Sequence, residues 1–570
     1  MSWLFGCLSR VPISEVGLSE FHTEPLYSYC NNNLYIAAGG NKRLLNIGEP
    51  DLMYHFIICG LGISWDCEHI LSAKQWDKTL EGYPDSLNKL NGHFCGVIVK
   101  HNSVRLITDL LGLRELYLLN TDTGWYFSTR MDWLMKVKSC EIDFSIFASR
   151  WLCYNQLSNK SIVKNIIRLN QGASAEIINN KITISNRNWV PEISNPISAE
   201  EFRGRLNKLI VLGEASGDKI SLSLSGGMDS RVILSILMNS GSKNWNCHTF
   251  HTDSPKDSII AEKMLTDLKI PYALLGRDNH YSNSDLDSLF EYTGTTFMTQ
   301  SAFNSVKLMN YSDLYESEII IDGGFGEIWR REYLALLNLR GRKYIEDKNY
   351  GKVAEFLRHN KANIFNNDIM SIMREGVAEQ IGDIFNILPE ADEIGIENWL
   401  DLFTIKSRLE NFFAPEQARL DNLVTSYMPF AQLSLLNDIL NLPLAEKKNN
   451  KLFKKIIIDK SPALAKYKLV MGNIYYPFRF STFQKRLYSK LNFQFIKTSG
   501  EKELDKFLLG KKEFIMDSLL SAPVKSYSPY NYEEISEKVN SYYNGNGRDG
   551  DYVNWFLTFE VFRQIMGGPK

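Results

Sequence analysis

One stretch in the middle of the chain constrains the fold more than any other. Between residues 220 and 275, short apolar segments alternate with helical patterns of ten or more residues. The pattern predicts strands and helices in the order 220–224, 230–239, 245–250, 256–268 and 272–275. Strands that alternate with helices of this length form right-handed βαβ units in a parallel sheet. Because ligands bind such sheets where the strands end, a site is expected at that edge.

A glycine loop follows the first of these strands and reads Ser225-Gly226-Gly227-Met228-Asp229-Ser230. Adjacent glycines let the backbone turn sharply and present several N–H groups to an anion at the positive end of the helix, so a polyphosphate would fit. Asp229 cannot bind phosphate directly, but it can hold Mg²⁺ against it. The loop lacks the GxxxxGK[ST] pattern of a Walker A loop. The alternative is an ordinary turn in which Asp229 or Ser230 caps the helix.

A second glycine loop follows a further predicted strand at 318–321 and reads Asp322-Gly323-Gly324-Phe325-Gly326-Glu327. Beyond residue 328, helical periodicity dominates to the end of the chain. The sequence therefore predicts an α/β fold whose parallel sheet is followed by a helical C-terminal part.

The N-terminal third has a different pattern. From about residue 20 to residue 190, short runs rich in β-branched and aromatic residues are separated by Asn, Gly and Asp, which predicts a mostly antiparallel β domain. The segment VPEISNPIS after Trp189 is typical of a linker, and a helical pattern follows it. We expect two domains, 1–190 and 198–570.

Composition excludes several classes of protein. The 570 residues include 64 Lys and Arg against 66 Asp and Glu, without the basic excess that favours nucleic acid as a partner. No apolar run approaches the roughly 18 to 20 residues that a membrane-spanning helix needs. Eight cysteines without a CxxC pair, and an N-terminus without a basic signal-peptide region, predict free thiols and a cytoplasmic protein.

Both glycine loops resemble signatures of one family. SGGMDS after an SLSL strand resembles the pyrophosphate loop of the asparagine synthetase and β-lactam synthetase superfamily, and residues 323–327 followed by Tyr333 look like its second signature. The chain departs from the family by placing Glu327 where the family has Asp, and Ile328 where asparagine synthetases have a second acid. The alternative for Glu327 is a solvated loop acid. The resemblance implies ATP and Mg²⁺ as cofactors, with Asp229 and Glu327 as metal ligands. It also implies that Ser225, Gly226, Gly227 and Ser230 cradle pyrophosphate, and that Gly323 and Gly324 are among the cofactor-binding residues.

Three weaker matches add candidate residues. The segment Lys466-Tyr467-Lys468-Leu469-Val470 resembles the part of β-lactam synthetases that carries a catalytic lysine, which aligns with Lys468; a surface lysine is the alternative. Glu416 lies near the position of the acid that helps to deprotonate the amine, or it is an ordinary acid at a helix start. By the same analogy, adenosine would lie at the residues that end the second strand of the sheet, Thr249, Phe250 and His251.

The N-terminal part resembles the glutaminase-type N-terminal nucleophile fold of the same family. The matching segments are LNGHF at 90–94, DLLGLRELY at 109–117 and IIRLNQG at 166–172. Glutamine hydrolysis in this fold needs a Cys directly after the initiator Met, where this chain has Ser2. Ser2 or Cys7 could in principle replace that nucleophile, but a structural domain without glutaminase activity is the expectation.

The resemblance implies an ATP-dependent ligase that adenylates a substrate carboxylate and transfers the acyl group to an amine. Without a glutaminase, the amine is expected on the substrate itself, which gives a lactam or the macrolactam of a peptide, as in lasso-peptide cyclases. The expected partners are a small-molecule or peptide carboxylate and other enzymes of a biosynthetic cluster. The alternatives are an asparagine synthetase or amidotransferase that uses ammonia or glutamine, and a nucleotide-binding scaffold without catalysis.

Overall fold

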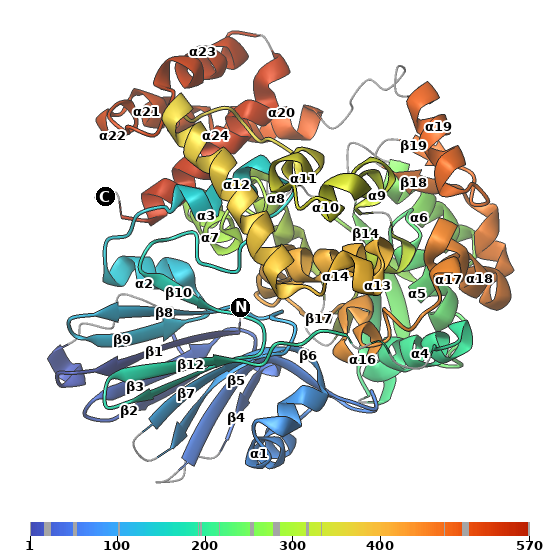
Figure 1. The fold of residues 1–570 in the computed structure, drawn as a ribbon, viewed down its shortest axis with the longest axis horizontal. Coiled ribbons are helices and arrows are strands. Elements are labelled where there is room, and N and C mark those ends of the chain that lie inside the picture. Colours follow the sequence, from blue (N-terminus) through green and yellow to red (C-terminus); the bar gives the residue numbers. More distant parts are fainter. Residues whose placement is uncertain are drawn as a thin grey trace.

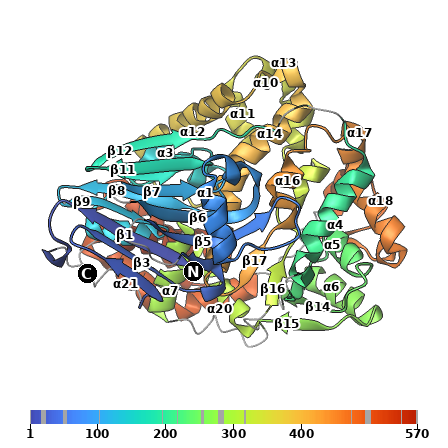
Figure 2. The ribbon, with the colours of Figure 1, turned by 90° about the horizontal axis from the view of Figure 1, so that it is seen from below.

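We describe the fold from a computed structural model of the chain. The structure describes residues 2–15, 24–48, 54–100, 103–191, 193, 196–215, 217–250, 256–276, 285–314, 318–331, 333–471, 474–492, 501–545 and 547–567. Figure 1 shows the antiparallel sheets of the N-terminal third against a larger body of helices and parallel strands, and Figure 2 shows the same arrangement from below.

The N-terminal part contains, in its described residues, two six-stranded antiparallel sheets. The first has the order β10-β8-β9-β1-β3-β2 and the second β12-β11-β7-β6-β5-β4. The strands are β1 (Trp3–Ser9), β2 (Tyr27–Cys30), β3 (Leu34–Gly39), β4 (Leu45–Ile47), β5 (Tyr54–Ser64), β6 (Leu90–Lys100), β7 (Ser103–Thr108), β8 (Leu116–Thr121), β9 (Gly124–Ser128), β10 (Ile166–Leu169), β11 (Ala173–Ile178) and β12 (Lys181–Asn186). The helices are α1 (Ala73–Glu81), α2 (Met131–Val137) and α3 (Phe144–Leu152).

The two antiparallel sheets form a sandwich. One buried apolar cluster draws side chains from both of them, among them Leu4 and Phe127 of the first sheet and Ile57 and Leu106 of the second. Alternating residues of a strand point to opposite faces, so the same strands also supply a second apolar surface. That surface joins a larger cluster that includes residues of both halves of the chain. The sandwich and the rest of the molecule therefore share one continuous core.

A parallel sheet forms the centre of the second half, as the alternating pattern predicts. Over the described residues it has five strands in the order β15-β14-β13-β16-β17, and every pair is parallel. The elements are α4 (Ala199–Ala215), β13 (Lys219–Ser223), α5 (Asp229–Leu237), β14 (Trp245–Phe250), α6 (Lys256–Asp267), β15 (Tyr272–Leu275), α7 (Leu286–Thr296), α8 (Ala302–Val306), β16 (Glu318–Ile321) and β17 (Thr425–Tyr427). The predicted α/β fold class, with antiparallel strands first and a helical part last, is confirmed.

The C-terminal part is mainly helical, with α12 lying against α3 of the N-terminal part (Figure 1). Its elements are the 3-10 helix η7 (Gly326–Arg330), α9 (Ala335–Arg340), α10 (Arg342–Glu346), α11 (Tyr350–Leu357), α12 (Asn367–Ile387), α13 (Ala391–Ile394), α14 (Ile396–Arg408), the π-helix η8 (Leu409–Phe413), α15 (Ala414–Leu420), α16 (Leu433–Leu436), α17 (Leu444–Lys447), α18 (Lys451–Lys460), β18 (Leu469–Met471), β19 (Ile474–Tyr476), α19 (Thr482–Asn492), α20 (Glu501–Gly510), α21 (Lys512–Leu520), α22 (Ala522–Lys525), α23 (Tyr532–Tyr543) and α24 (Gly550–Ile565).

Two features of this part differ from the helical pattern read in the sequence. The strand β17 adds an edge to the parallel sheet, and β18 and β19 form a small antiparallel ladder beside the first glycine loop. Each of these strands has three residues, too short for a period of two to stand out from helical neighbours. Across the described ranges, none of the helices combines the length and the apolar character needed to span a membrane.

Candidate functional site

Both glycine loops lie at the carboxyl ends of adjacent strands and line one cavity. The first loop leads from β13 into α5, and the second follows β16, which pairs in parallel with β13. The cavity between them has a volume of about 350 Å³. Its lining includes Ser225, Gly227, Met228, Asp229, Ser230, Asp322, Gly323, Arg330, Val470, Met471, Tyr476 and Lys485. Five of the predicted site residues, Ser225, Gly227, Asp229, Ser230 and Gly323, therefore face one space.

The first loop is tightly bonded to its own side chains. Ser230 Oγ accepts a hydrogen bond from Ser225 N at 3.1 Å, and Ser225 Oγ accepts one from Gly227 N at 3.2 Å. The N–H of Gly226 donates to Asp257 Oδ1 at 3.0 Å. These bonds hold the turn in a compact shape, and an anion that binds these N–H groups has to replace the side-chain oxygens.

Gly226 lies on the side of the loop that packs against β18. A Cβ atom added there would lie 2.5 Å from Val470 Cγ2 and 3.1 Å from Asp257 Oδ1. Its carbonyl accepts hydrogen bonds from Val470 N at 3.2 Å and from Arg231 Nη2 at 3.1 Å. The position therefore requires glycine because of a close approach, and not because the residue faces the cavity.

The second loop packs directly on Asp229. Added Cβ atoms would lie 2.8 Å from Ser230 N at Gly323 and 2.5 Å from Asp229 Cγ at Gly326. Phe325 adopts a left-handed conformation with φ +65°, and its ring packs edge to face on Phe413. The predicted residue Gly324 donates its N–H to Asp322 Oδ1 at 2.6 Å. The glycines of this loop thus allow it to close against the start of α5.

Both predicted metal ligands are paired with arginines. Arg330 donates from Nε to Asp229 Oδ1 at 2.5 Å and from Nη2 to Asp229 Oδ2 at 2.7 Å. Glu327 Oε1 lies 3.3 Å from Arg408 Nη2, and the Arg408 guanidinium stacks 4.0 Å from the centre of the Tyr333 ring. Mg²⁺ takes hard oxygen ligands such as carboxylates, and here Arg330 binds both oxygens of Asp229 while Arg408 lies beside one oxygen of Glu327. The donor set therefore does not fit Mg²⁺ bound between Asp229 and Glu327, whose role as a metal pair stays a prediction.

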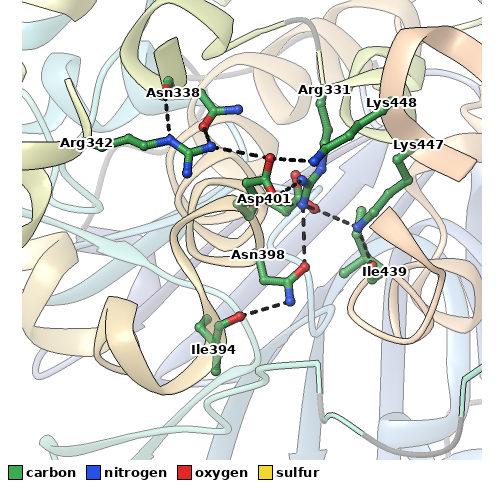
Figure 3. A network of polar contacts seen from close by, with 10 residues as sticks. Arg331, Asn338, Arg342, Ile394, Asn398, Asp401, Ile439, Lys447 and Lys448 are labelled. Atoms are coloured by element: carbon green, nitrogen blue, oxygen red, sulfur yellow. Dashed lines mark hydrogen bonds and ion pairs between the residues drawn. The ribbon is translucent and has the colours of Figure 1, made fainter. Parts of the chain in front are cut away.

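A network of polar contacts surrounds Arg331, the residue that follows Arg330 (Figure 3). Arg331 has a left-handed backbone with φ +55°, and its Nη2 donates to Asp401 Oδ2 at 2.6 Å. Lys447 is buried and donates to the same oxygen at 2.7 Å and to the carbonyl of Ile439 at 2.6 Å. Because two cations share Asp401 away from water, the chain at Arg331 is fixed, and with it the direction of Arg330.

Acidic side chains gather behind the second loop. Burial raises the pKa of Asp322 to about 6, and the carboxylates of Glu416 and Glu327 act in the same direction. Glu416, the predicted acid on α15, forms an ion pair with Arg419. Burial also raises the pKa of Tyr311, and the negative charge of Asp322 adds to this effect. A protonated Asp322 would be a hydrogen-bond donor at the end of the cavity, which an ionised carboxylate is not.

The structure places Lys468 beside the first loop but outside the cavity. Arg231 is buried and donates from Nη2 to the Lys468 carbonyl at 2.8 Å and to the Gly226 carbonyl at 3.1 Å, so it joins the two segments. The side chain of Lys468 is exposed. The lysine that lines the cavity is Lys485 on α19, whose Nζ lies 5.2 Å from the centre of the Tyr476 ring.

Two of the three residues that are predicted to bind adenosine lie within the described part of the chain. Thr249 is buried at the end of β14, and the half-buried ring of Phe250 packs edge to face on Tyr311 at 5.0 Å. His251 lies outside the described residues. Neither Thr249 nor Phe250 is among the residues that line the cavity, so nucleotide binding there stays a prediction.

The sandwich segments 90–94, 109–117 and 166–172 contribute residues that contact the second half of the chain. His93 Nε2 lies 3.2 Å from Asp421 Oδ2, Arg168 Nη1 donates to Asn411 Oδ1 at 2.6 Å, and Gln171 Oε1 accepts from Lys406 Nζ at 2.7 Å. Beyond these segments, Asn155 Oδ1 accepts from the hydroxyl of Tyr333 at 3.0 Å. The N-terminal part thus supports the residues of the candidate site.

Ser2 and Cys7 are both buried in this sandwich. Ser2 Oγ accepts a hydrogen bond from Arg114 Nη2 at 3.0 Å, and Arg114 also binds the Ser2 carbonyl. Burial raises the pKa of Cys7 to about 12, against a smaller opposite effect of Tyr126. A thiol with this pKa is protonated near neutral pH and is a poor nucleophile.

Several polar residues of the site are not among those that the sequence patterns predict. They are Asp257, Asp322, Arg330, Arg408 and Lys485. Asp322 and Arg330 flank residues 323–327 of the second loop, and this position next to a glycine loop is the signal in the sequence that marks them. Arg408 and Lys485 lie on helices far along the chain, and no local pattern marks them.

Comparisons with known proteins give distant matches in structure alone. No protein-family model matches the chain, and no curated protein sequence matches it. One solved structure that matches is glutamine phosphoribosylpyrophosphate amidotransferase from B. subtilis complexed with ADP and GMP, with 11% identity, coverage of 58% of this chain and 77% of the other, and a TM-score of 0.21. Another, described as the allosteric regulatory enzyme of purine biosynthesis, has 11% identity, coverage of 56% and 68%, and a TM-score of 0.21. At these values the likeness carries no argument about this chain.

Proposed function

We propose that the chain is an ATP-dependent carbon–nitrogen ligase that activates a carboxylate as an acyl-adenylate and transfers the acyl group to an amine. One observation carries the proposal: the two loops that resemble asparagine synthetase and β-lactam synthetase signatures line one cavity at the carboxyl ends of adjacent parallel strands. The start of α5, Arg330 and Lys485 lie around the same cavity, so a polyphosphate would meet N–H donors and cations there.

The chemistry proposed for this site has two steps. A carboxylate oxygen of the substrate attacks the α-phosphorus of ATP, and the bond from that phosphorus to the pyrophosphate oxygen breaks. An amine then attacks the acyl carbon, the bond to AMP breaks, and the amine loses a proton as the amide forms. Ser225, Gly227, Ser230 and Lys485 would bind the pyrophosphate part of ATP, and Lys468 would stabilise the charge that develops on it.

The amine in this proposal belongs to the substrate, which gives a lactam or a macrolactam. Support comes from the N-terminal part, in which Ser2 is buried and bonded to Arg114, and Cys7 is buried. In this proposal residues 1–190 are a structural domain without glutaminase activity, and residues 198–570 carry the ligase. Glu416 would help to deprotonate the amine. Support for its nearness to the cavity is that its carboxylate acts to raise the pKa of Asp322, which lines that cavity.

ATP binding and pyrophosphate exchange test the proposal. Isothermal titration with ATP should show binding, and labelled pyrophosphate should exchange into ATP when a substrate carboxylate is present. The matched control is Gly204→Ala, at a helical position with open space around it, which should behave as wild type. Failure to bind ATP would refute the proposal. Binding without exchange across a panel of carboxylates would favour the non-catalytic scaffold, and exchange followed by transfer to free ammonia would favour an amidotransferase.

A further inference from the structure

The cations that meet the two loop carboxylates are part of the chain itself. Arg330 binds both oxygens of Asp229, and Arg408 lies beside Glu327. We propose that these two arginines take the place of a bridging divalent cation, and that the cavity binds its polyphosphate ligand without metal, with Arg330 in contact with it. This inference rests on the proposed function in one respect, namely that the ligand is a polyphosphate.

Charge supports the substitution of arginines for a metal. Two carboxylates and one divalent cation sum to zero, and so do two carboxylates and two guanidinium groups. A bidentate guanidinium–carboxylate pair is among the stronger polar contacts in proteins, and a cation that binds Asp229 has to displace it. Within the described ranges, no three His, Cys, Asp or Glu side chains come together in a way that could hold a metal ion.

Arg330 is positioned to act on a ligand. Its side chain is 10% exposed and lines the cavity, where it ends the 3-10 helix η7. The network of Arg331, Asp401 and Lys447 fixes the following residue (Figure 3). Gly326 brings η7 against Asp229, since an added Cβ would lie 2.5 Å from Asp229 Cγ. The guanidinium is therefore held in one direction before a ligand binds, which reduces the entropy lost on binding.

The geometry of a guanidinium suits this double role. It has five N–H donors in a planar fork, and Asp229 takes bonds from Nε and Nη2. A guanidinium can in general hold a carboxylate with one edge and contact a phosphate oxygen with another. The hydroxyls of Ser225 and Ser230 and the ammonium of Lys485 line the same space and would bind other oxygens of a polyphosphate.

The experiment compares binding with and without divalent metal. Tripolyphosphate and ATP are titrated into the full chain by calorimetry, once in Mg²⁺ and once in EDTA at equal ionic strength. We expect dissociation constants that agree within about twofold in the two buffers, and a loss of at least about tenfold in affinity in Arg330→Met. Arg330→Lys should recover part of the loss. Arg374→Met, on the exposed face of α12, is the matched control and should bind as wild type. Circular dichroism and thermal unfolding check that each variant folds.

A second measurement separates this inference from the proposed function. Electron paramagnetic resonance of Mn²⁺ with the protein, with and without tripolyphosphate, should show no site that depends on Asp229, whereas Arg330→Met should gain one. Affinity that falls more than about tenfold in EDTA, or a wild-type Mn²⁺ site that Asp229→Asn abolishes, would overturn the inference. If neither polyphosphate binds in either buffer, the proposed function is wrong, and the Mn²⁺ result alone decides whether arginines exclude the metal.

Discussion

Arg114 and Asp421 form an ion pair between the N-terminal sandwich and the end of α15, and neither side chain is exposed to solvent. His93 approaches the same Asp421 oxygen at 3.2 Å, and Gln417 Nε2 donates to the other at 3.0 Å. Burial acts to raise the pKa of Asp421, but His93 and Arg114 outweigh it and hold that pKa below its ordinary value. The charged pair therefore fixes the sandwich on the second half of the chain.

Replacement of one partner should destabilise the protein strongly. Asp421→Asn leaves Arg114 as a buried charge without its counter-ion, and we expect a loss of about 3 to 5 kcal/mol in the free energy of unfolding. Chemical denaturation measures it. The double variant Arg114→Met with Asp421→Leu should cost less than the summed losses of Arg114→Met and Asp421→Leu measured singly, because it removes both charges of the pair. Strictly additive losses would show that the two residues do not interact.

Glu410 should make stability depend on pH. Burial raises its pKa to about 7, and the charges of Glu115 and Asp109 add to this effect while Arg168 and Lys406 oppose it. Since the unfolded chain releases this proton near the ordinary value of 4.5, the unfolded state binds fewer protons between pH 4.5 and about 7, and stability falls as pH rises.

Glu410→Gln should remove up to about 3 kcal/mol of the difference in unfolding free energy between pH 5 and pH 8. Urea denaturation at both pH values measures the difference. Part of the pH dependence should persist in the variant, because burial also raises the pKa of Asp109 and Asp322 to about 6. An unchanged difference would show that Glu410 does not titrate in this range.

The protein should not release glutamate from glutamine. Ser2 is buried and bonded to Arg114, and the Cys7 thiol is protonated at neutral pH, so neither presents a nucleophile to a substrate. The assay measures glutamate after incubation with glutamine, with and without ATP. Glutamate formed at a catalytic rate, and abolished by Ser2→Ala or Cys7→Ala, would contradict this and favour an amidotransferase.

The two lysines near the first loop should differ in effect. Lys485 lines the cavity, so Lys485→Met should mainly weaken ATP binding. Lys468 is exposed beside the loop and is proposed to act on developing charge, so Lys468→Ala should lower kcat by roughly a hundredfold with little change in ATP affinity. Steady-state kinetics with separate ATP titrations distinguish the two. A large loss of ATP affinity in Lys468→Ala with normal turnover would refute its proposed role.

The close approach of Gly323 to the main chain of Ser230 can be tested by adding a methyl group at Gly323. In Gly323→Ala the new Cβ would lie 2.8 Å from the main-chain nitrogen of Ser230, so one loop has to move. We expect a loss of about 1 to 3 kcal/mol in stability together with weaker ATP binding. Gly204→Ala in α4 has no atom within 4 Å of the added Cβ and should be neutral or stabilising by up to about 1 kcal/mol. Thermal unfolding compares the two, and equal melting temperatures would contradict the packing argument.

Local pattern was enough to predict the parallel sheet and the position of its first loop. The strand predicted at 245–250 and the strand predicted at 318–321 have the observed bounds. The first mixes aromatic and polar residues and the second is mainly isoleucine, and residues typical of turns flank them. That Ser225 and Gly323 lie near each other follows from the parallel pairing of β13 with β16, which the local pattern does not predict.

Side-chain pairing across the fold could not be predicted in this way. Arg330 lies 101 residues beyond Asp229, and whether its long side chain turns toward that carboxylate depends on the left-handed turn at Arg331 and the buried contacts of Asp401. The three-residue strand β17 is likewise set by its pairing with β16, and the sequence around it reads as helix.

The π-helix between α14 and α15 sets the rotational phase of α15 relative to α14. Arg408, just before it, faces Tyr333, while Glu410 within it lies beside Gly112 of the sandwich. Deletion of one residue here would restore ordinary helical pitch and turn the following side chains by about 100°. Glu416 would then leave Asp322, and Asp421 would leave Arg114, although no residue of either contact had been altered. The length of this segment is therefore as important as the identity of the residues at the candidate site and at the interface. A deletion within it would disrupt the Glu416–Asp322 and Arg114–Asp421 contacts at the same time.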